Sequence, residues 1–549
     1  MDPENILLVP SATIVPEELR LDLGPIPMAM IPLQGWPVLE HVSGKYKFDV
    51  SKHVATMNNR ERIEDFISKK DDSWNEISLD SSSSLAETVL FSLESLELGG
   101  KYLYINFADT LIDNIRDYEQ DVIFYDEVDY RSRWTSFSSE NGEITDITEK
   151  FSEHPNGSQK VFTGVFGFKE PELFKEKLKE NLNTDSELSS FFSALRAYLE
   201  DRDYRLIKAE NWTDVGHLDT YHEAKKEFLN TRNFNELSVD TRKNVITKRS
   251  EDTEKLKPEI EWYDKIPSEL APYTPRIYSS SVDETGSMLE MDYTGHPSLG
   301  ELLLFGSHES HIWNTIYSNI FDMLEEFESF SKELAEDEVR ENLEKMYLDK
   351  TLRRLGKIKD DEMFSDFFEK EEVVINGKKM KSAGYIFHNL EEILDESGVY
   401  SIKNFCVLHG DLNFSNILYD VRSGSIKLID PRGEFGKFDI YGDIRYDLAK
   451  MRHSVSGKYD FIINDMFEVE VNEREIKYEV FENDLHIERE KKFDEILRTR
   501  HQGSLKDVKL IESLLFLSMV PLHSDKPERQ KYMITKGIEL FNETILVEQ

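Results

Sequence analysis

Short apolar runs alternate with helically spaced apolar residues along the first part of the chain. Three runs are typical of buried strands: Ile6–Val9, Leu103–Phe107 and Val161–Phe166. Leu85–Leu96 has the apolar spacing of a helix, and Ser84 with Glu87 three positions later predicts a capping box at its start. Strands that alternate with helices of this length predict a mainly parallel sheet with helices on both faces.

The pattern changes near residue 235. Asn244–Lys248 and Ser287–Tyr293 have the character of strands, and a helical region around Glu259 lies between them. From Ile312 to Leu355 the spacing is helical, with one apolar face made of Ile316, Ile320, Met323, Leu324 and Phe327. We therefore predict two domains, residues 1–232 and 233–549, and divide the second into a small α+β lobe (233–295) and a helical lobe (296–549).

Charge and composition exclude several classes of function. The 67 basic and 108 acidic side chains give a formal net charge of -41, which repels a phosphate backbone, so we expect no nucleic-acid partner. No apolar stretch reaches the length of a membrane-spanning helix, so we expect no membrane insertion. The chain begins with an acidic segment rather than a basic leader, and its one cysteine, Cys406, cannot form an internal disulfide. These features predict a cytoplasmic protein, and a homo-oligomer is compatible with them.

The strongest candidate for chemistry is the segment His409–Asn416, which lies between the strand-like runs Phe405–Leu408 and Ser425–Ile429. Transfer of a phosphoryl group requires a carboxylate that orients and deprotonates the accepting hydroxyl, and oxygen ligands that hold magnesium against the phosphates. Asp411 supplies such a carboxylate, and Asn416, five residues later, supplies a metal ligand. Asp430 follows the next strand and adds a second hard oxygen. Hydrolysis by the same acids is the alternative, but no His/Cys cluster accompanies them.

This segment resembles the catalytic core of the aminoglycoside phosphotransferase and choline kinase superfamily, which has the protein-kinase-like fold. The resemblance spans roughly residues 235–545. It implies that Asp411 is the catalytic base and that Asn416 and Asp430 bind Mg²⁺ together with ATP or GTP. It also implies that His409 and Asp447 support the catalytic loop.

Upstream of that loop, Val245–Lys248 resembles the strand whose lysine holds the nucleotide phosphates in the same superfamily. The resemblance implies that Lys248 binds ATP and that Glu259 is its helix partner, with Glu261 as the alternative. The preceding segment, Leu237–Arg242, contains no glycine, so a free approach of its backbone to the phosphates is not guaranteed. The identity of the nucleotide therefore stays open.

A second pattern, Pro25–His41, is similar to the signature of sugar-phosphate nucleotidyltransferases. Asp109, after a strand, and Asp214, in Trp212–His217, look like the two metal-binding acids of that family. The resemblance covers roughly residues 5–230 and implies a Rossmann-like domain with a mixed sheet that binds a second nucleoside triphosphate, such as CTP or UTP. As single aspartates at strand ends, the two residues can equally be loop caps.

The same region departs from the nucleotidyltransferase pattern where the family places its phosphate-binding groups. Pro10–Thr13 stands in place of a glycine-rich loop, and Met28 and Trp36 stand in place of lysines. Nucleotidyl transfer builds negative charge on the attacked phosphorus and on the departing pyrophosphate, which cations normally stabilise. We therefore expect no ordinary pyrophosphorylase activity from this domain.

Taken together, the two resemblances imply an α/β protein in which a nucleotidyltransferase-like domain precedes a bilobal kinase-like domain. The expected activity is ATP-dependent phosphorylation of a hydroxyl on a sugar, polyol or amino alcohol. The arrangement resembles proteins of bacterial capsule and surface-polysaccharide synthesis. Two alternatives stay open: a bifunctional kinase and nucleotidyltransferase that makes a nucleotide-activated precursor, and a non-catalytic first domain that binds a nucleotide or acts as a scaffold.

Overall fold

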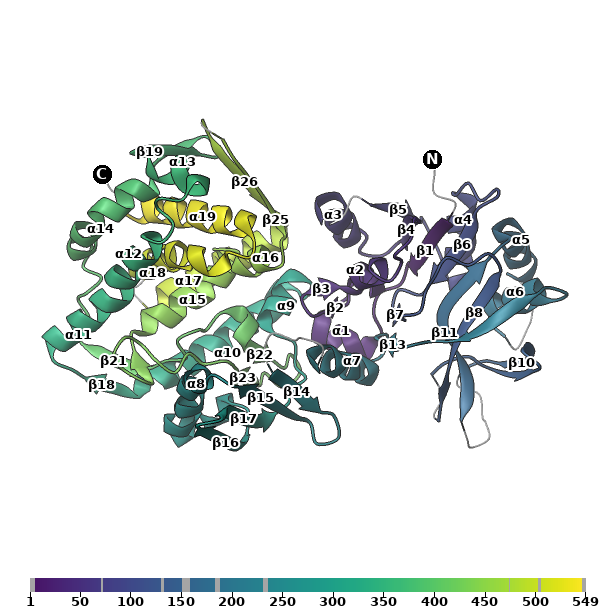
Figure 1. The fold of residues 1–549 in the computed structure, drawn as a ribbon, viewed down its shortest axis with the longest axis horizontal. Helices are drawn as coiled ribbons and strands as arrows, with labels where there is room; N and C mark the ends of the chain where they lie inside the picture. Colours follow the sequence, from purple (N-terminus) through teal and green to yellow (C-terminus); the bar gives the residue numbers. More distant parts are fainter. Residues whose placement is uncertain are drawn as a thin grey trace. The chain divides into compact units, whose positions relative to one another are not determined.

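The computed structural model describes residues 5–70, 73–129, 133–150, 158–182, 188–230, 236–472, 474–501 and 505–545. They form two compact units: the first runs up to Phe228 and includes Phe305–Ser307, and the second comprises the other residues from Leu229 onward (Figure 1). The domain boundary expected between residues 232 and 233 lies outside the described residues. No helix within the described ranges is long and apolar enough to cross a lipid bilayer.

A nine-stranded sheet forms the centre of the first unit. Its main path runs in the order β10-β9-β11-β6-β1-β4-β5, and β8 and β12 extend it from β11. The strands are β1 (Asn5–Ser11), β4 (Ser51–Thr56), β5 (Trp74–Ser78), β6 (Tyr102–Asn106), β8 (Asp121–Val128), β9 (Ser136–Glu140), β10 (Glu143–Thr148), β11 (Gln159–Phe168) and β12 (Tyr204–Lys208).

The sheet is mixed, as the nucleotidyltransferase resemblance implies, and the expectation of a mainly parallel sheet is wrong. Strands β5, β4, β1 and β6 are parallel, and so are β8 and β12. Strand β11 is antiparallel to β6, β8 and β9. An apolar run encodes burial but not strand direction, so the sequence pattern did not reveal the reversal at β11.

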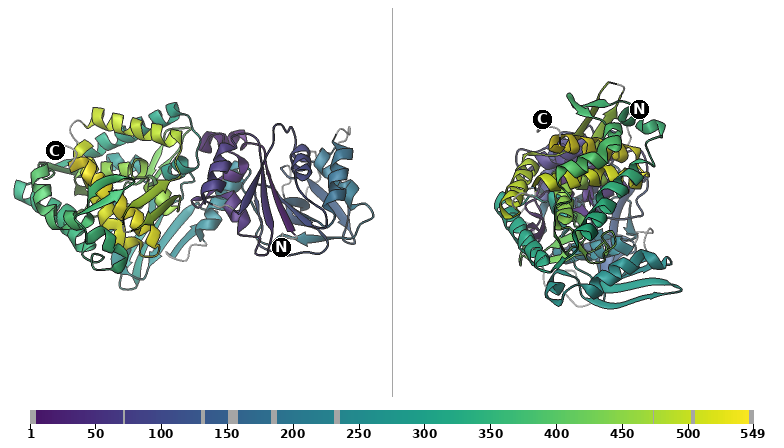
Figure 2. Two further views of the ribbon diagram at one scale, coloured as in Figure 1. Left: turned by 90° about the horizontal axis from the view of Figure 1, so that it is seen from above. Right: turned by 90° about the vertical axis from the view of Figure 1, so that its left-hand side faces the viewer.

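Side chains on both faces of the sheet are buried, as expected for a covered sheet. On one face, Leu8 and Ile105 pack with the helices α4 (Leu85–Glu94), α5 (Pro171–Asn181) and α6 (Ser190–Leu199). The alternate residues Leu7 and Tyr104 on the other face are also fully buried. Helices lie on either side of the strands in the left view of Figure 2.

The predicted cap at the start of α4 is present in a modified form. The Ser84 hydroxyl accepts a hydrogen bond from the Glu87 backbone N–H (3.2 Å), as expected. The Glu87 carboxylate, however, accepts from the backbone N–H of Ser83 (2.6 Å), one residue before the position that a standard capping box uses.

The second unit begins with an antiparallel sheet of four strands in the order β14-β15-β17-β16. These strands are β14 (Glu236–Asp240), β15 (Val245–Ser250), β16 (Ile277–Asp283) and β17 (Gly286–Asp292). Helix α8 (Thr253–Lys265) packs on this sheet through Leu256 and Ile260, which meet Leu289 and Met291 of β17. These elements lie within residues 233–295, where the sequence predicts a small α+β lobe.

The rest of the second unit is mostly helical. Its main helices are α9 (Leu299–Leu304), α10 (Ser310–Ser329), α11 (Glu336–Leu343), α12 (Lys350–Leu355), α14 (Ala383–Ser397), α15 (Ile444–Val455), α17 (Asp484–Arg500), α18 (Leu505–Met519) and α19 (Pro527–Ile545). The apolar face predicted in α10 is buried. The helical stretch expected from Ile312 to Leu355 is interrupted by β18 (Ser331–Glu333) and contains a π-helical segment, Glu344–Asp349.

Short β-strands flank the loop His409–Asn416 on both sides. Strand β21 (Asn404–Val407) lies between β18 and β24 (Tyr441–Gly442) and precedes this loop. Strands β22 (Ile417–Tyr419) and β23 (Ile426–Leu428) form an antiparallel hairpin after it. The strands predicted at Phe405–Leu408 and Ser425–Ile429 are therefore present within one or two residues.

Candidate functional site

Lys248 connects the small lobe to the segment that follows β23. It lies in β15, opposite Leu237 of β14 and Leu289 of β17. Its Nζ forms an ion pair with Glu259 Oε1 of α8 at 2.6 Å and a second ion pair with Asp430 Oδ1. Burial acts to lower the pKa of Lys248, but the two carboxylates outweigh it and raise the pKa, so the ammonium stays charged.

The structure places Glu259, and not Glu261, on Lys248. Glu261 forms an ion pair with Lys265 at 2.6 Å instead. The segment after Asp430 approaches the same helix closely at Gly433, which has φ of +72°. A Cβ at this position would lie 1.9 Å from the carbonyl oxygen of Pro258, so only glycine allows this approach.

The turn that precedes the strand of Lys248 is tight. It joins β14 to β15, and the Asp240 carboxylate accepts hydrogen bonds from the backbone N–H groups of Arg242 (3.0 Å) and Lys243 (3.1 Å). Asn244 adopts the left-handed conformation (φ +54°) that such a turn requires. The turn is therefore ordered by side-chain caps, without glycine.

Asp411 lies on the loop between β21 and β22. Its side chain is 39% exposed, and Oδ1 forms an ion pair with Lys450 Nζ of α15 at 2.8 Å. Burial acts to raise the pKa of Asp411, but the nearby ammonium outweighs it and holds the pKa below its usual value. The carboxylate is therefore ionised at neutral pH and able to accept a proton.

The hairpin register brings Asn416 next to Asp430. Ile417 pairs with Leu428, and the Ile429 backbone N–H donates to the Asn416 carbonyl at 3.1 Å. The Asn416 Nδ2 donates to the Asp411 carbonyl at 2.9 Å, which turns its Oδ1 away from that bond. One amide oxygen and one half-exposed carboxylate fit a hard cation that takes its other ligands from phosphates and water.

His409 and Asp447 support the shape of this loop. The two carboxylate oxygens of Asp447, a residue of α15, accept the backbone N–H groups of His409 (2.7 Å) and Gly410 (2.9 Å). His409 donates from Nε2 to the Ile429 carbonyl (2.9 Å) and accepts the Asp411 N–H at Nδ1 (3.3 Å). Burial lowers the pKa of His409 to about 4, so its ring is neutral and supports the loop through these two hydrogen bonds.

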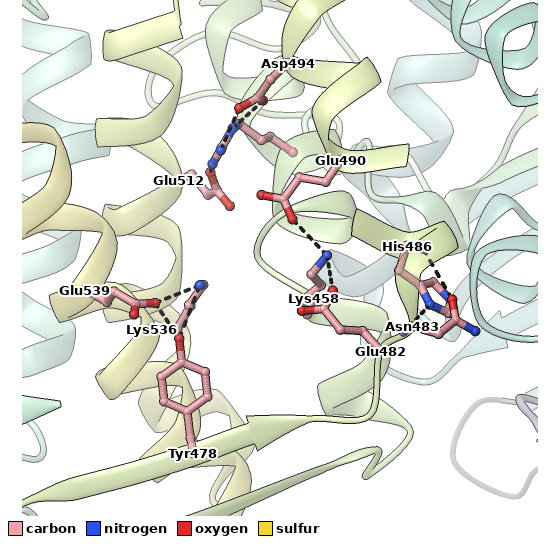
Figure 3. A network of polar contacts seen from close by, with 11 residues as sticks. Lys458, Tyr478, Glu482, Asn483, His486, Glu490, Asp494, Glu512, Lys536 and Glu539 are labelled. Atoms are coloured by element: carbon pink, nitrogen blue, oxygen red, sulfur yellow. Dashed lines mark hydrogen bonds and ion pairs between the residues drawn. The ribbon is translucent and has the colours of Figure 1, made fainter. Parts of the chain in front are cut away.

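Helix α15 carries Asp447 and Lys450, and buried ion pairs hold it in place. Arg452 donates from Nε and Nη2 to Asp494 of α17 (2.9 and 3.0 Å) and from Nη1 to Glu512 of α18. These two carboxylates are drawn in Figure 3, together with the neighbouring contacts of Lys458 and Lys536. Because Arg452 is 3% exposed, this contact links three helices away from solvent.

Lys450 was not among the residues singled out from the sequence. It lies three positions after Asp447 and one helical turn after Tyr446, in the segment Tyr446–Lys450. The available signal was the four-residue spacing of Tyr446 and Lys450, which places both on one face of a helix. Which face meets Asp411 depends on the tertiary structure, and the sequence does not reveal it.

In the first unit, Asp109 and Asp214 lie close together. Strand β7 (Thr110–Leu111) pairs with β13 (Thr213–Asp214) so that Asp214 lies opposite Thr110. A Cβ on Gly216 would lie 2.4 Å from Asp109 Oδ2, so the turn after β13 closes tightly over this carboxylate. Burial and the Asp214 charge raise the pKa of Asp109 to about 7.

Asp214 is oriented by three donors. Its Oδ2 accepts from Trp134 Nε1 (2.8 Å), and its Oδ1 accepts from the Gly216 N–H (2.9 Å) and the Thr220 hydroxyl (3.0 Å). Two carboxylates held this close repel each other, and a divalent cation between them relieves the repulsion. Within the described ranges no group of three or more His, Cys, Asp or Glu residues gathers as a metal site, so the donor set here is this pair.

Ser11 and Trp36, which stand at positions where phosphate-binding groups are expected, and the nearby cation Arg20 all have structural contacts. The Ser11 hydroxyl accepts the Ala29 N–H (3.1 Å), and Arg20 donates from Nε to the Val15 carbonyl (2.7 Å). The ammonium of Lys70 lies 4.6 Å from the ring centre of Trp36. Arg20, which lies in helix α1 (Glu17–Leu23), is therefore engaged with the backbone of the segment that precedes this helix.

Comparison with protein families gives one match. The family model for nucleotidyl transferases matches residues 95–231. This segment contains Asp109, Asp214 and the strands of the first unit from β6 to β13. It confirms the resemblance expected for the first unit. No curated protein matches the chain.

Three solved structures are similar at low sequence identity. CTP:phosphocholine cytidylyltransferase from Streptococcus pneumoniae is 11% identical and covers 41% of this chain and 99% of its own, with a TM-score of 0.34. 4-Diphosphocytidyl-2C-methyl-D-erythritol synthase from Anaerococcus prevotii is 11% identical and covers 41% and 95%, with a TM-score of 0.29. An aminoglycoside-3'-phosphotransferase of type VIII is 14% identical and covers 54% and 84%, with a TM-score of 0.29.

Proposed function

We propose that the second unit is a kinase that transfers the γ-phosphoryl group of ATP or GTP to a hydroxyl of a small molecule: a sugar, a polyol or an amino alcohol. The observation that carries the proposal is the meeting of Lys248, Glu259 and Asp430 beside the loop of Asp411 and Asn416. Ion pairs alone are common on protein surfaces. A carboxylate, an amide and a paired lysine at one junction between a sheet and a catalytic loop form a set that phosphoryl transfer needs.

In this proposal each side chain has one task. Lys248, held by Glu259, binds nucleotide phosphate oxygens. Asp430 and Asn416 would hold Mg²⁺, and the cation would neutralise charge on the transferred phosphoryl group. Asp411 accepts the proton of the attacking hydroxyl, and its lowered pKa keeps it in the ionised form that this role requires. Asp447 and His409 keep Asp411 in position through the backbone.

The first unit is proposed to bind a nucleoside triphosphate such as CTP or UTP, with a divalent cation at Asp109 and Asp214. The nucleotidyl transferase match and the close pair of carboxylates support this assignment. Phosphorylation of an alcohol followed by activation of that phosphate is a chemically consistent order for the two units. Synthesis of a capsule or surface-polysaccharide precursor in the cytoplasm is the setting that this order favours.

Calorimetry with Mg·ATP on the full chain tests the kinase proposal. We expect Asp430→Ala to lose magnesium-dependent binding and Asn416→Ala to weaken it, because these two side-chain oxygens would hold the cation that the nucleotide phosphates also bind. Asp264→Ala, which removes an exposed acid on α8, is the matched control and keeps wild-type affinity. Unchanged affinity for Mg·ATP in both site variants contradicts the proposal.

A further inference from the structure

Four cationic side chains gather beside Asp411, around the hydroxyl of Tyr446. Lys350 Nζ donates to this hydroxyl at 3.1 Å, and Arg432 Nη1 donates to it at 3.3 Å. Lys450, one turn after Tyr446 on α15, contacts Asp411 at 2.8 Å. Tyr446 is 1% exposed, so the hydroxyl meets these cations away from bulk water.

The fourth cation, Arg354, lies one turn after Lys350 on α12 and donates from Nη1 to the Ser518 carbonyl at 3.1 Å. Within the part of the chain that the structure describes, neither residue forms an ion pair with a carboxylate, and neither does Arg432. Lys350 is only 7% exposed. A buried cation without a counter-ion is costly, and this is unexpected in a chain with a net charge of -41.

The charges that face the cluster do not neutralise it. Asp411 is engaged with Lys450, Asp447 with two backbone N–H groups, and the exposed Glu434 acts on Arg432 from the solvent side. The pKa of Lys350 is consistent with this surplus of positive charge. Burial, with Arg432 and Lys450 nearby, lowers the pKa of Lys350 to about 8 even though the Tyr446 hydroxyl opposes the shift.

The positive charge of the same cations lowers the pKa of the Tyr446 hydroxyl, although burial opposes this shift. Burial acts to raise the pKa of its hydroxyl, but Lys350, Arg432 and Lys450 outweigh burial and lower the pKa to about 7. A phenol is a weak acid, and it becomes this acidic only where positive charge is in excess. The cluster is therefore a place where an anion is stabilised.

Resting on the kinase function proposed above, we propose that Lys350, Arg354, Arg432 and Lys450 bind an oxyanion group of the acceptor, a carboxylate or a phosphate. The acceptor is then a sugar or polyol that also carries negative charge, which narrows the acceptor class proposed above: neutral alcohols and amino alcohols are poor substrates. The cluster comes from α12, α15 and the segment after β23, and Lys450 joins it to Asp411. An anion held there leaves a hydroxyl of the same molecule free to reach Asp411.

The reaction balances with the groups already named. The acceptor hydroxyl gives its proton to Asp411, and its oxygen forms a bond to the γ-phosphorus of ATP. The bond from that phosphorus to the bridging oxygen breaks, and ADP leaves. The oxyanion group of the acceptor takes no part in bond making. It fixes orientation, which lowers the entropic cost of the transfer.

Inorganic phosphate is the first probe, titrated by calorimetry into the full chain saturated with Mg·ADP, so that the nucleotide site is filled. We expect phosphate to bind to the wild type, and we expect Arg354→Gln and Arg432→Gln to weaken this binding about tenfold or more. Arg353→Gln removes the exposed neighbouring cation on α12 and keeps wild-type affinity. No phosphate binding to the wild type, or equal binding in Arg354→Gln, overturns the proposal.

Turnover with a matched set of three-carbon alcohols identifies the anion. Glycerol, glycerate, glycerol phosphate and 3-aminopropane-1,2-diol share a scaffold and differ in charge. ADP formation that is fastest with glycerate indicates that the cluster binds a carboxylate, and ADP formation that is fastest with glycerol phosphate indicates a phosphate. A preference for glycerol or the amine overturns the anionic acceptor but leaves the kinase proposal standing. Loss of Mg·ATP binding in Arg354→Gln would assign the cluster to the nucleotide and would also overturn the proposal of an anionic acceptor. Absence of Mg·ATP binding in the wild type would contradict the kinase proposal itself.

Discussion

Replacing Arg452 by leucine tests how firmly the helical lobe holds the catalytic loop. Arg452 is buried between Asp494, 8% exposed, and Glu512, 0% exposed, and bonds to both. The variant leaves two buried carboxylates without the arginine that pairs with both of them. Breaking a buried pair in this way costs about 3–5 kcal/mol. At about 2–4 °C per kcal/mol, the melting temperature falls by about 6–20 °C.

The loss has a predictable pH dependence. Burial already raises the pKa of Glu512 against the opposing effect of Arg452, and without the arginine this folded-state pKa rises further above the unfolded value. A raised carboxyl pKa penalises folding above the unfolded pKa, and the penalty shrinks as the pH falls. Arg452→Leu is therefore expected to lose more stability at pH 8 than at pH 5.

Thermal and urea unfolding of the full chain at the two pH values measure this effect. Arg498→Leu, which removes an exposed arginine on the neighbouring helix α17, is the control and changes the melting temperature by little. An Arg452→Leu variant as stable as the wild type at pH 8 would refute the reasoning, because it would show that the two carboxylates find other partners or water.

Three further predictions concern the ATP site, the carboxylate pair of the first unit and the cationic cluster. Glu259→Gln raises the KM for Mg·ATP about tenfold or more because Lys248 loses its charged partner. Glu261→Gln leaves this KM unchanged because the Glu261 carboxylate pairs with Lys265, and initial-rate measurements of both variants test the difference. Metal-dependent nucleotide binding at the first unit strengthens as the pH rises through about 7, where Asp109 loses its proton, and the Asp109→Ala variant loses this binding. Calorimetry with Mg·CTP or Mg·UTP in the Asp411→Asn background measures the affinity. The same protein is expected to release no pyrophosphate from either nucleotide when sugar or alcohol phosphates are added. Tyrosinate absorbance of one residue appears near pH 7 in the wild type and is absent in Tyr446→Phe; titration only at the ordinary tyrosine pKa contradicts the account of the cluster.

Local spacing in the sequence predicted much of the candidate site. Asp411 and Asn416 share one loop, and Asp430 follows the strand that pairs with the segment after it, so local spacing already brings them close. Which of Glu259 and Glu261 pairs with Lys248 became clear only from the orientation of helix α8 in the structure. Two positions correspond to roughly 200° of rotation, so the two side chains point to opposite sides of α8, and only one meets Lys248.

The cationic cluster was beyond the reach of sequence reasoning. Lys350 and Tyr446 are far apart in the chain and meet only because α12 and α15 both pack against α18. Likewise, the apolar run of β11 predicted a strand but not its antiparallel direction. Local chemistry and burial are encoded in short windows, whereas direction and long-range partners are set by the assembled core.

The most direct test of the kinase account is the turnover of Asp411→Asn in the full chain. ADP formation from Mg·ATP is measured with the preferred three-carbon acceptor, alongside Mg·ATP affinity by calorimetry. A positioned base contributes about 10²–10⁴-fold to the rate, so turnover should fall by this factor while affinity for Mg·ATP is unchanged. A variant that keeps more than about a tenth of wild-type turnover contradicts the account, because Asp411 is then not the base.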